Sequence, residues 1–287
     1  MVGWICRDYR NSLDGFILTA LFEVDRVVYR YDSLVAVNGV SMTVRPGMRV
    51  ALLGANGSGK STLLRLLDGL YYPASGSVSF DGNPLERERL EQDEFAFAFR
   101  RRVGLVFQNP DVQLFNPTVF DEVAFGPLQL RWERDTILAR VEQMLDQLEI
   151  GHLKHRPPHR LSGGEKKRVA LASVLVLDPE VLLLDEPTAA LDPRSQSQII
   201  DLLIGWGDGN KTVITATHDL GLVEDIADYC YLLQAGQVAS EGKPADVLRD
   251  QALLASANLI HAHRHYHGSG TSAHAHPHTH PHNHAGS

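Results

Sequence analysis

The sequence contains little cysteine and has no excess of positive charge. Only Cys6 and Cys230 occur among its 287 residues, far apart and outside any metal-binding or redox spacing. A disulfide framework is therefore not expected, and a reducing compartment is favoured. Lys and Arg number 27 against 35 Asp and Glu, which gives a net charge of −8. Because a broad nucleic-acid-binding surface needs positive charge, nucleic acid is not an expected partner.

The chain also lacks a long apolar run. The longest, over residues 169–177, contains Ser173 and ends before Asp178, so it is shorter than the roughly 18 residues that a membrane-spanning helix needs. Residues 1–20 carry Asp8 and Asp14 among scattered apolar residues, unlike a secretory signal with a basic start and an apolar core. We expect a chain that does not cross a membrane and whose first 20 residues form an extension of unknown role.

Apolar patterns divide the chain into an antiparallel β region, a parallel sheet and a helical part. Residues 23–31 and 35–44 alternate in polarity around a short turn, as paired strands do. Residues 136–148 place apolar side chains on one helical face and predict a helical subdomain. Short apolar runs separated by helical or loop material predict a mostly parallel α/β sheet, and they cover 49–53, 103–107, 181–184 and 213–217. There is no internal repeat, so we expect one domain over residues 21–258.

A glycine-rich segment directly follows the apolar run 49–53 and precedes a helical pattern. Residues 54–61 fit the phosphate-loop pattern G-x-x-x-x-G-K-[ST]. Glycines let backbone N–H groups turn toward phosphate oxygens, a lysine adds positive charge, and a serine hydroxyl is a Mg²⁺ ligand. This predicts a site for ATP and Mg²⁺ formed by Gly54, Asn56, Gly57, Ser58, Gly59, Lys60, Ser61 and Thr62.

Two adjacent carboxylates, Asp185 and Glu186, follow the apolar run 181–184. Such a pair is often only the end of a strand, but in α/β sheets the carboxyl ends of strands are also where ligands bind. Together with the phosphate loop, the pair predicts a hydrolytic site. Asp185 is expected to hold Mg²⁺, directly or through water, alongside Ser61, and Glu186 is expected to act as general base on the attacking water.

Residues 161–170, Leu-Ser-Gly-Gly-Glu-Lys-Lys-Arg-Val-Ala, closely resemble the signature segment of ABC ATPases. Gln108, Asp192 and His218 stand around it in that family's motif order, and the resemblance covers roughly residues 21–248. It implies an α/β fold, a P-loop NTPase of the ABC type, with a mostly parallel sheet, an antiparallel β subdomain and a helical subdomain. It also implies an enzyme that hydrolyses ATP to drive transport.

The resemblance assigns further roles at the nucleotide. Gln108 would contact Mg²⁺ and sense the γ-phosphate, and His218 would contact the γ-phosphate, so both join Glu186 as expected catalytic residues. Tyr31 would stack on adenine, with Tyr29 as a rival for that position.

The signature segment is expected to act between two subunits. Its residues Ser162, Gly163 and Gly164 open a predicted helix, where backbone N–H groups suit an anion, and in the family they bind the ATP of the opposite subunit. Asp192 is expected at the same dimer interface. The chain departs from the common pattern at Glu165, where Gln is frequent, and at 189–190, where Ser-Ala is usual; we expect activity to survive both changes.

Residues 103–127 resemble the energy-coupling-factor group of importers, which take up vitamins or cobalt and nickel. In that group the stretch after the glutamine faces a membrane coupling protein. Two interpretations of its apolar residues remain equal at this point: contact with a partner helix or packing inside the domain. The residues concerned are Leu114, Phe115, Val119, Phe120 and Phe125.

From about residue 259 the composition reduces to His, Ala, Pro, Gly, Ser and Thr, which predicts a disordered tail over 259–287. An expression tag is the alternative origin, but tags are usually uninterrupted and these histidines form two clusters. Imidazole binds Ni²⁺, Co²⁺ and Zn²⁺, so we expect a metal-binding tail used for transport, sensing or storage. The histidines are His261, His263, His265, His267, His274, His276, His278, His280, His282 and His284.

The leading hypothesis is the ATPase subunit of a cobalt or nickel importer, bound peripherally at the cytoplasmic face of the cell membrane. Its expected partners are a second ATPase subunit, identical or paralogous, a membrane coupling protein and a substrate-binding membrane subunit. A vitamin importer of the same design is the alternative. A soluble ABC ATPase of translation or DNA repair, and a metal-storage protein with a vestigial ATPase, are less favoured.

Overall fold

The computed structural model describes residues 20–207, 211–264 and 275–278. Its N-terminal part is an antiparallel sheet with the strand order β2-β1-β4-β5. Buried and exposed side chains alternate over residues 22–25 of β1 and 40–44 of β2. This alternation explains the period of two in this part of the sequence. The strands are β1 (Phe22–Tyr31), β2 (Leu34–Val44), β4 (Ser75–Phe80) and β5 (Asn83–Pro84).

The second sheet has six strands in the order β10-β9-β3-β8-β7-β6, and all neighbours are parallel except β10 and β9. Every residue of β7 and β8 is buried, which is why neither strand alternates between exposed polar and buried apolar residues. The strands are β3 (Arg49–Leu53), β6 (Val103–Val106), β7 (Val181–Asp185), β8 (Thr212–Thr217), β9 (Tyr229–Gln234) and β10 (Gln237–Gly242).

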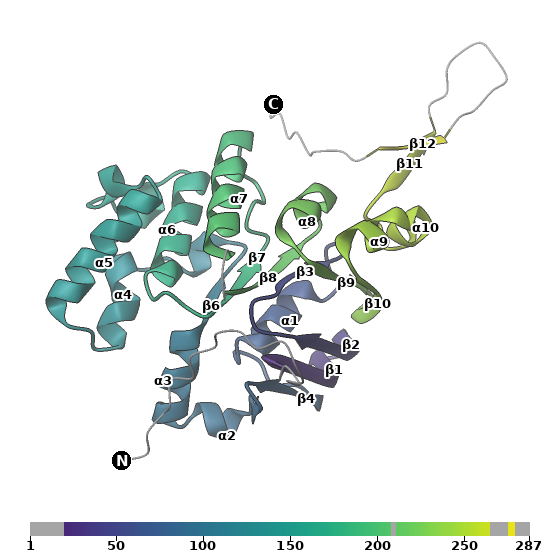
Figure 1. Cartoon of the computed structure of the whole chain (residues 1–287), viewed down its shortest axis with the longest axis horizontal. Helices are drawn as coiled ribbons and strands as arrows, with labels where there is room; N and C mark the ends of the chain where they lie inside the picture. Colours follow the sequence, from purple (N-terminus) through teal and green to yellow (C-terminus); the bar gives the residue numbers. More distant parts are fainter. Residues whose placement is uncertain (1–19, 208–210, 265–274, 279–287) are drawn as a thin grey trace, which may run out of the picture.

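Helices cover both sheets and divide the core into three clusters. The apolar face of α1 (Lys60–Leu67) packs in a cluster that joins the two sheets. A second cluster lies under α4 (Val119–Gln129), α5 (Arg134–Gln147) and α6 (Gly163–Leu175), which form a separate helical layer (Figure 1). A third joins β3 and β9 to the C-terminal helices. The other helices are α2 (Arg87–Leu90), α3 (Asp93–Arg102), α7 (Pro193–Gly207), α8 (Leu220–Ile226), α9 (Pro244–Arg249) and α10 (Gln251–Ser256).

This architecture confirms the predicted fold class: a mostly parallel sheet, an antiparallel β subdomain and a helical subdomain. The strand expected over 103–107 ends at Val106. The backbone of Phe107 instead binds side chains, since its N–H donates to the Gln113 side chain and its carbonyl accepts from Lys167. The polypeptide therefore leaves the sheet one residue before Gln108.

The C-terminal boundary differs from the prediction. Leu259 and Ile260 pack against the third core cluster, so disorder does not begin at residue 259. Their apolar side chains continue the face that α10 buries. Farther on, β11 (His261–Arg264) and β12 (Ala275–His278) pair as antiparallel strands. For 265–274 and 279–287, as for the extension over 1–19, the predictions lie outside the described residues.

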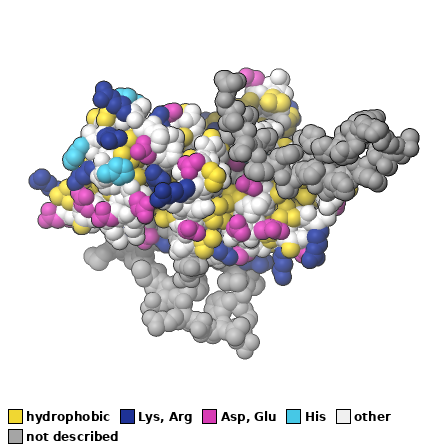
Figure 2. Space-filling model, turned by 90° about the horizontal axis from the view of Figure 1, so that it is seen from above, with side chains coloured by type: hydrophobic (Ala, Val, Ile, Leu, Met, Phe, Trp, Pro, Cys, Tyr) yellow, Lys and Arg dark blue, Asp and Glu magenta, His cyan; other side chains and the backbone are white. Residues whose placement is uncertain are grey.

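Within the part of the chain that the structure describes, no helix has the length and apolar composition of a membrane span. Acidic and basic side chains are intermixed on the face shown in Figure 2, as a mildly acidic net charge of −8 allows. The view shows no continuous basic field on that face.

Candidate nucleotide-hydrolysis site

The phosphate loop joins β3 to α1 and is shaped by close backbone contacts. Gly59 has a φ of +105°, and a Cβ at this position would lie 2.5 Å from the carbonyl oxygen of Ala36. Any other residue would be strained and would push against the β2 backbone. The contact fixes the loop against the antiparallel sheet, directly before the first turn of α1.

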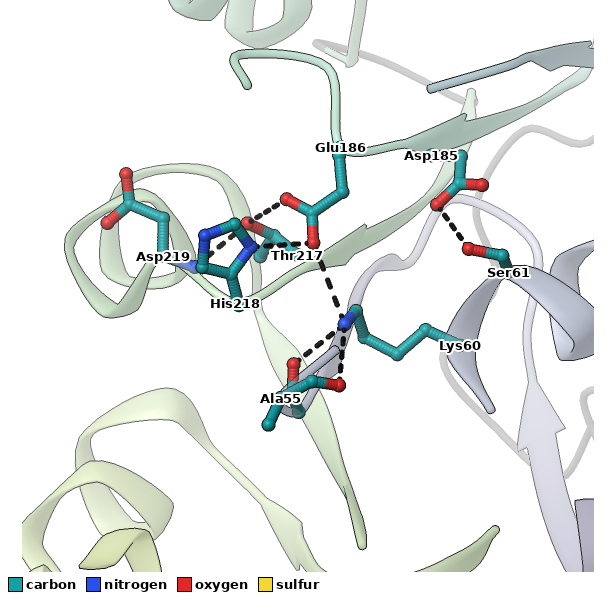
Figure 3. Close-up of polar contacts among 9 residues, drawn as sticks. Ala55, Lys60, Ser61, Asp185, Glu186, Thr217, His218 and Asp219 are labelled. Carbon is teal, nitrogen blue, oxygen red and sulfur yellow. Dashed lines mark hydrogen bonds and ion pairs between the residues drawn. The ribbon is translucent and has the colours of Figure 1, made fainter. Parts of the chain in front are cut away.

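Lys60 turns back toward the loop that it follows. Its Nζ donates to the carbonyl oxygens of Gly54 at 2.7 Å and Ala55 at 3.2 Å, and lies 3.6 Å from Glu186 Oε1 (Figure 3). Burial lowers the pKa of Lys60, while the charges of Glu186 and Asp185 act in the opposite direction. The ammonium group is thus held at the centre of the loop, with its charge partly balanced by carboxylates.

Two carboxylates stand at the carboxyl end of β7 and point to different partners. Asp185 Oδ1 accepts a hydrogen bond from Ser61 Oγ at 2.9 Å, so strand and helix meet across this contact (Figure 3). Burial raises the pKa of Asp185, and the Ser61 hydrogen bond opposes that effect. Glu186 has a positive φ of 47°, and its N–H donates to the carbonyl oxygen of Ala216. This backbone turn directs its side chain away from that of Asp185.

Glu186 is only 3% exposed and is surrounded by residues from the end of β8. Its Oε1 lies 2.8 Å from His218 Nδ1, and its Oε2 accepts from Thr217 Oγ1 at 3.4 Å (Figure 3). The hydrogen bond with Glu186 raises the pKa of His218, and burial of the imidazole opposes the rise. A buried carboxylate therefore has both a cation and a titratable imidazole within contact distance.

A cleft of about 420 Å³ brings most of the predicted nucleotide residues together. Its walls come from the phosphate loop, the end of β7, the loop after β6 and the turn between β1 and β2. Lys60, Ser61 and Thr62 line it, with Gln108 and Glu186 on other sides. The predicted site residues that line it are Tyr31, Asn56, Gly57, Gly59, Lys60, Ser61, Thr62, Gln108 and Glu186.

Tyr31 and its rival Tyr29 occupy different environments. Tyr31 lines the cleft, and its hydroxyl lies 3.2 Å from Thr62 Oγ1. The ring of Tyr29 is stacked on Tyr71, with centroids 5.0 Å apart and planes at 5°, and packs against the core. Of the two rings, only Tyr31 is among the residues that line the cleft.

The residues of the site fit a triphosphate and its magnesium ion. Ser58 Oγ, in the phosphate loop, is buried and has no hydrogen-bond partner among the described residues. A buried hydroxyl without a partner is unfavourable, and a phosphate oxygen would satisfy it. Ser61 and Asp185 offer two oxygen ligands in direct contact, the donor type that Mg²⁺ prefers.

The signature residues lie elsewhere. Ser162 is the N-cap of α6 and forms a capping box with Glu165, in which Ser162 N donates to Glu165 Oε2 at 2.7 Å. This hydrogen bond lowers the pKa of Glu165. Ser162 and Gly163 are exposed, and neither these two nor Gly164 lines the cleft. One chain thus presents a helix N-terminus to solvent instead of to its own cleft.

Asp192, predicted for the nucleotide and dimer interface, also lies outside the lining of the cleft. Its carboxylate accepts hydrogen bonds from the N–H of Arg194 and Ser195 and from the Ser195 hydroxyl at 2.6 Å. These bonds lower its pKa. Gly164 of the signature approaches the same element, because a Cβ there would lie 3.1 Å from Ser195 Oγ. The two dimer-related predictions therefore meet on one surface.

Some residues at the site were not predicted from the sequence. Thr217 contacts Glu186, and its position directly before His218 is the signal that indicates it. Leu34, Val35 and Ala36 form one wall of the cleft, but in the sequence they read only as an alternating strand.

The apolar residues after Gln108 divide between the two interpretations. Val119 is fully buried, and Leu114 and Phe120 pack on the second core cluster. Phe115 and Phe125, in contrast, are 68% and 37% exposed, and their rings contact each other edge to face at 4.9 Å. Leu128, three residues after Phe125 on α4, is 56% exposed. We call Phe115, Phe125 and Leu128 the apolar patch.

The metal-binding tail stays a prediction. In the pairing of β11 with β12, His261 lies opposite His278 and His263 opposite His276. The remaining histidines of the tail, His265, His267, His274, His280, His282 and His284, lie outside the described residues.

A phosphate loop, a Mg²⁺-type oxygen pair and a buried carboxylate beside a histidine define a P-loop nucleotide hydrolase. The chain belongs to the ABC transporter family, since the family model of that description matches residues 37–189. It is the ATPase of a transporter, with ATP and Mg²⁺ as cofactors and ATP hydrolysis coupled to transport.

Two curated relatives are similar over most of their length. Nickel import ATP-binding protein NikO of Rhodobacter capsulatus is 57% identical over 246 residues, which cover 85% of this chain and 97% of the relative. Energy-coupling factor transporter ATP-binding protein EcfA of Methanothermobacter thermautotrophicus is 42% identical over 240 residues, 83% of this chain and 76% of the relative. The predicted energy-coupling-factor type is thereby confirmed.

Solved structures show the same fold. cbiO1 from Clostridium perfringens, described as part of the ABC transporter complex cbiONQ, has a TM-score of 0.70 and 38% identity, with 84% of this chain and 95% of that chain covered. A dimeric ATP-binding cassette in a post-hydrolysis state, bound to ADP and Pi, has a TM-score of 0.70 and 28% identity, with 78% and 98% covered.

Proposed function

We propose that this chain is the ATPase subunit of a nickel or cobalt importer of the energy-coupling-factor type. The observation that carries the proposal is the 57% identity to NikO over nearly the whole of that nickel-import ATPase. The similarity to cbiO1 of the cbiONQ complex supports the same class of importer. The nucleotide cleft described above supplies the hydrolytic part.

Hydrolysis is assigned to the groups around Glu186. Ser61 and Asp185, with Gln108 as a further ligand, would hold Mg²⁺, which would supply positive charge against the phosphates. Lys60 contributes a positive charge to the phosphates. Its Nζ already contacts carbonyl oxygens of the phosphate loop, so the ammonium group is close to the proposed phosphate position. Glu186, buried and oriented by its backbone turn, takes the proton of the attacking water.

Two further residues complete the assignment: Tyr31, which lines the cleft, and His218, which does not line it but contacts Glu186. His218 contacts the γ-phosphate and, through its 2.8 Å contact, keeps the Glu186 carboxylate in place. Tyr31 carries the adenine ring, because of the two candidate tyrosines it is the one that lines the cleft. In this proposal the nucleotide lies between the antiparallel sheet and the end of the parallel sheet.

The complete ATPase is a dimer of this chain with itself or with a paralogue. The exposed N-terminus of α6, formed by Ser162, Gly163 and Gly164, is suited to phosphate through its backbone N–H groups and helix dipole. A second subunit would present it to the ATP, and Asp192 lies beside it through Ser195. The dimeric relative with ADP and Pi supports this arrangement.

The apolar patch is proposed to bind a helix of the membrane coupling protein. Two exposed phenylalanines in ring contact and a leucine three residues farther on α4 form an apolar surface without a partner among the described residues. An amphipathic helix would bury such a surface. The chain would thus be held peripherally at the cytoplasmic face of the membrane, next to the coupling protein and the substrate-binding subunit.

The ten tail histidines are proposed to bind Ni²⁺, Co²⁺ or Zn²⁺. The affinity of a histidine site depends on the chemistry of the metal ion and does not reveal which ion is transported. The tail therefore supports a role in metal handling without identifying the transported ion. Delivery to the importer, sensing and storage are all compatible with it.

Uptake of ⁶³Ni²⁺ and ⁵⁷Co²⁺ tests the proposal. Cells lacking the chain should lose uptake of at least one ion, and the wild-type chain should restore it while a Glu186→Gln chain should not. The matched control is Lys243→Met, an exposed residue before α9. Unchanged uptake of both ions without the chain would contradict the proposal.

A vitamin importer is the second candidate, supported by the similarity to EcfA. Vesicles containing the complete transporter separate the two: ATP-dependent uptake of a vitamin with no Ni²⁺ or Co²⁺ uptake would select this alternative. Co-purification with ribosomes or DNA instead of membranes would favour a soluble ABC ATPase.

A further inference from the structure

Two side chains bond the backbone on either side of Gln108 to α6. Lys167 Nζ donates to the carbonyl oxygens of Phe107 at 3.2 Å and Gln108 at 3.0 Å. Gln113 completes the connection: its Oε1 accepts from Phe107 N at 3.2 Å, and its Nε2 donates to the carbonyl oxygen of Ala170 at 2.9 Å. The backbone at the end of β6 is therefore bonded to α6 through both its N–H and its carbonyl groups. We call Lys167 and Gln113 the α6 clamp.

Burial makes the lysine of the α6 clamp unusual. Lys167 is 2% exposed and forms no ion pair within the described residues, so its ammonium depends on the two backbone carbonyls. Burial lowers the pKa of Lys167 to about 8, and the charges of Asp185 and Glu186 act in the opposite direction. Since burying an ammonium costs free energy, an apolar residue would fill the same space at less cost if packing were its only role.

The α6 clamp joins two parts of the nucleotide site that are 50 or more positions apart in the sequence. Gln108 lines the cleft, while Ser162, the N-cap of α6, lies five positions before Lys167 on the same helix. Those five positions span only about 7.5 Å of a rigid α-helix. Lys167 therefore links the Gln108 backbone to the N-terminus of α6 over a short path.

We propose that Lys167 and Gln113 are positioning residues that set Gln108 in the cleft and make its loop move together with the signature end of α6. The proposal rests on the role of Gln108 at Mg²⁺ assigned above. It adds that turnover depends on two side chains that do not themselves line the cleft. Binding of nucleotide to the phosphate loop does not require them.

Kinetics of the dimeric ATPase test the proposal with Lys167→Met and, independently, Gln113→Leu. Each should lower kcat about tenfold and raise the Mg²⁺ concentration for half-maximal turnover, because a hydrogen bond that holds the Gln108 backbone is lost. Affinity for MgATP should stay within about threefold of wild type. The control is Lys243→Met, an exposed lysine before α9 that takes no part in the contact between α6 and the Gln108 loop; kcat should change less than about twofold.

A double-mutant cycle with Gln108→Ala separates positioning from general support. If Lys167 acts through Gln108, adding Lys167→Met to Gln108→Ala should lower kcat by less than about twofold further. A full second tenfold loss in that background, or wild-type kcat and Mg²⁺ dependence in both clamp variants, would overturn the proposal. Thermal unfolding shows whether each variant is folded. If Lys167→Met does not fold, the same measurements on Gln113→Leu, alone and combined with Gln108→Ala, test the proposal.

A separate result would show that the role assigned to Gln108 at Mg²⁺ is wrong. Gln108→Ala with wild-type kcat and Mg²⁺ dependence would remove the role of Gln108 itself, and the proposal with it. Impaired Gln108→Ala together with additive losses in the clamp variants would overturn only the α6 clamp.

Discussion

At the scale of single residues, the carboxylate of Glu186, the proposed general base, is held in a defined position. Its positive φ of 47° is an uncommon conformation for a non-glycine residue, and the hydrogen bond from its N–H to Ala216 maintains it. Lys60, His218 and Thr217 each contact the carboxylate. The conformation orients one side chain toward the cleft while Asp185, its neighbour, faces Ser61.

Replacing Glu186 by Gln tests its role as general base. The amide keeps the shape of the side chain but does not take a proton, so MgATP should still bind while phosphate release falls about 10²-fold or more. Measurement of nucleotide affinity and steady-state phosphate release checks this. Turnover close to wild type would show that another group accepts the proton.

The pKa of His218 provides a second test at this scale. The hydrogen bond with Glu186 raises it, so in nucleotide-free protein the stability from this pair is complete below pH 6.5 and lost as pH rises through the higher folded value. Glu186→Gln should therefore lower the His218 pKa toward its ordinary value in an NMR titration. Thr217→Val, which keeps the carboxylate, should leave the pKa raised. A His218 pKa that is the same in Glu186→Gln as in wild type would contradict the assignment.

At the scale of elements, the N-terminus of α6 explains why Glu is accepted where Gln is frequent. Position 165 supplies the acceptor of the capping box, and its oxygen receives the Ser162 N–H. A carboxylate and an amide oxygen both perform this task. The sequence departure therefore concerns a structural hydrogen bond at the start of the helix.

Substitutions at Glu165 should follow from that contact. Glu165→Ala removes the acceptor and should lower stability by about 1 kcal/mol, which is about 2–4 °C in melting temperature for a chain of this size. Glu165→Gln should melt close to wild type and keep ATP turnover. Calorimetry checks both, and equal losses in the two variants would show that charge matters more than the capping box.

The elements themselves were predictable where local chemistry was strong. The phosphate loop, β7 with its two carboxylates and α6 with its cap follow from short residue patterns. β4, with the weakly apolar sequence SGSVSF, did not, because its place in the sheet depends on pairing with β1. The α6 clamp was also not predictable: Gln113 and Lys167 are 54 positions apart, and a lysine in a helix normally indicates a solvated face.

At the scale of the whole molecule, the nucleotide cleft and the apolar patch occupy different parts of the surface. The cleft lies between the phosphate loop and the strand ends, while the apolar patch lies on the helical layer, beyond the loop of Gln108. The α6 clamp and the loop after β6 connect these regions. If the two proposals are correct, hydrolysis and partner binding use separate residues that this connection links.

The apolar patch should be required for transport but not for nucleotide binding. Phe115→Ala combined with Phe125→Ala removes exposed rings, so MgATP affinity should stay within about threefold of wild type while association with the membrane subunits is lost. Co-purification with those subunits and Ni²⁺ or Co²⁺ uptake by cells check this. The control is Leu138→Ala, which changes an exposed apolar residue on α5 outside the patch. Normal uptake with both phenylalanines replaced would assign the patch another role.

The tail should be separable from the ATPase if the chain is ended at the correct residue. Leu259 and Ile260 pack against the third core cluster, so a chain ending at Ile260 should keep its melting temperature and its turnover, whereas one ending at Asn258 should melt lower. Equilibrium dialysis against Ni²⁺ without nucleotide should show binding to the full chain and a loss of most of it in the chain ending at Ile260. Replacing all ten tail histidines by alanine is the matched control and should give the same loss. Binding that persists in both variants would place the metal outside the tail.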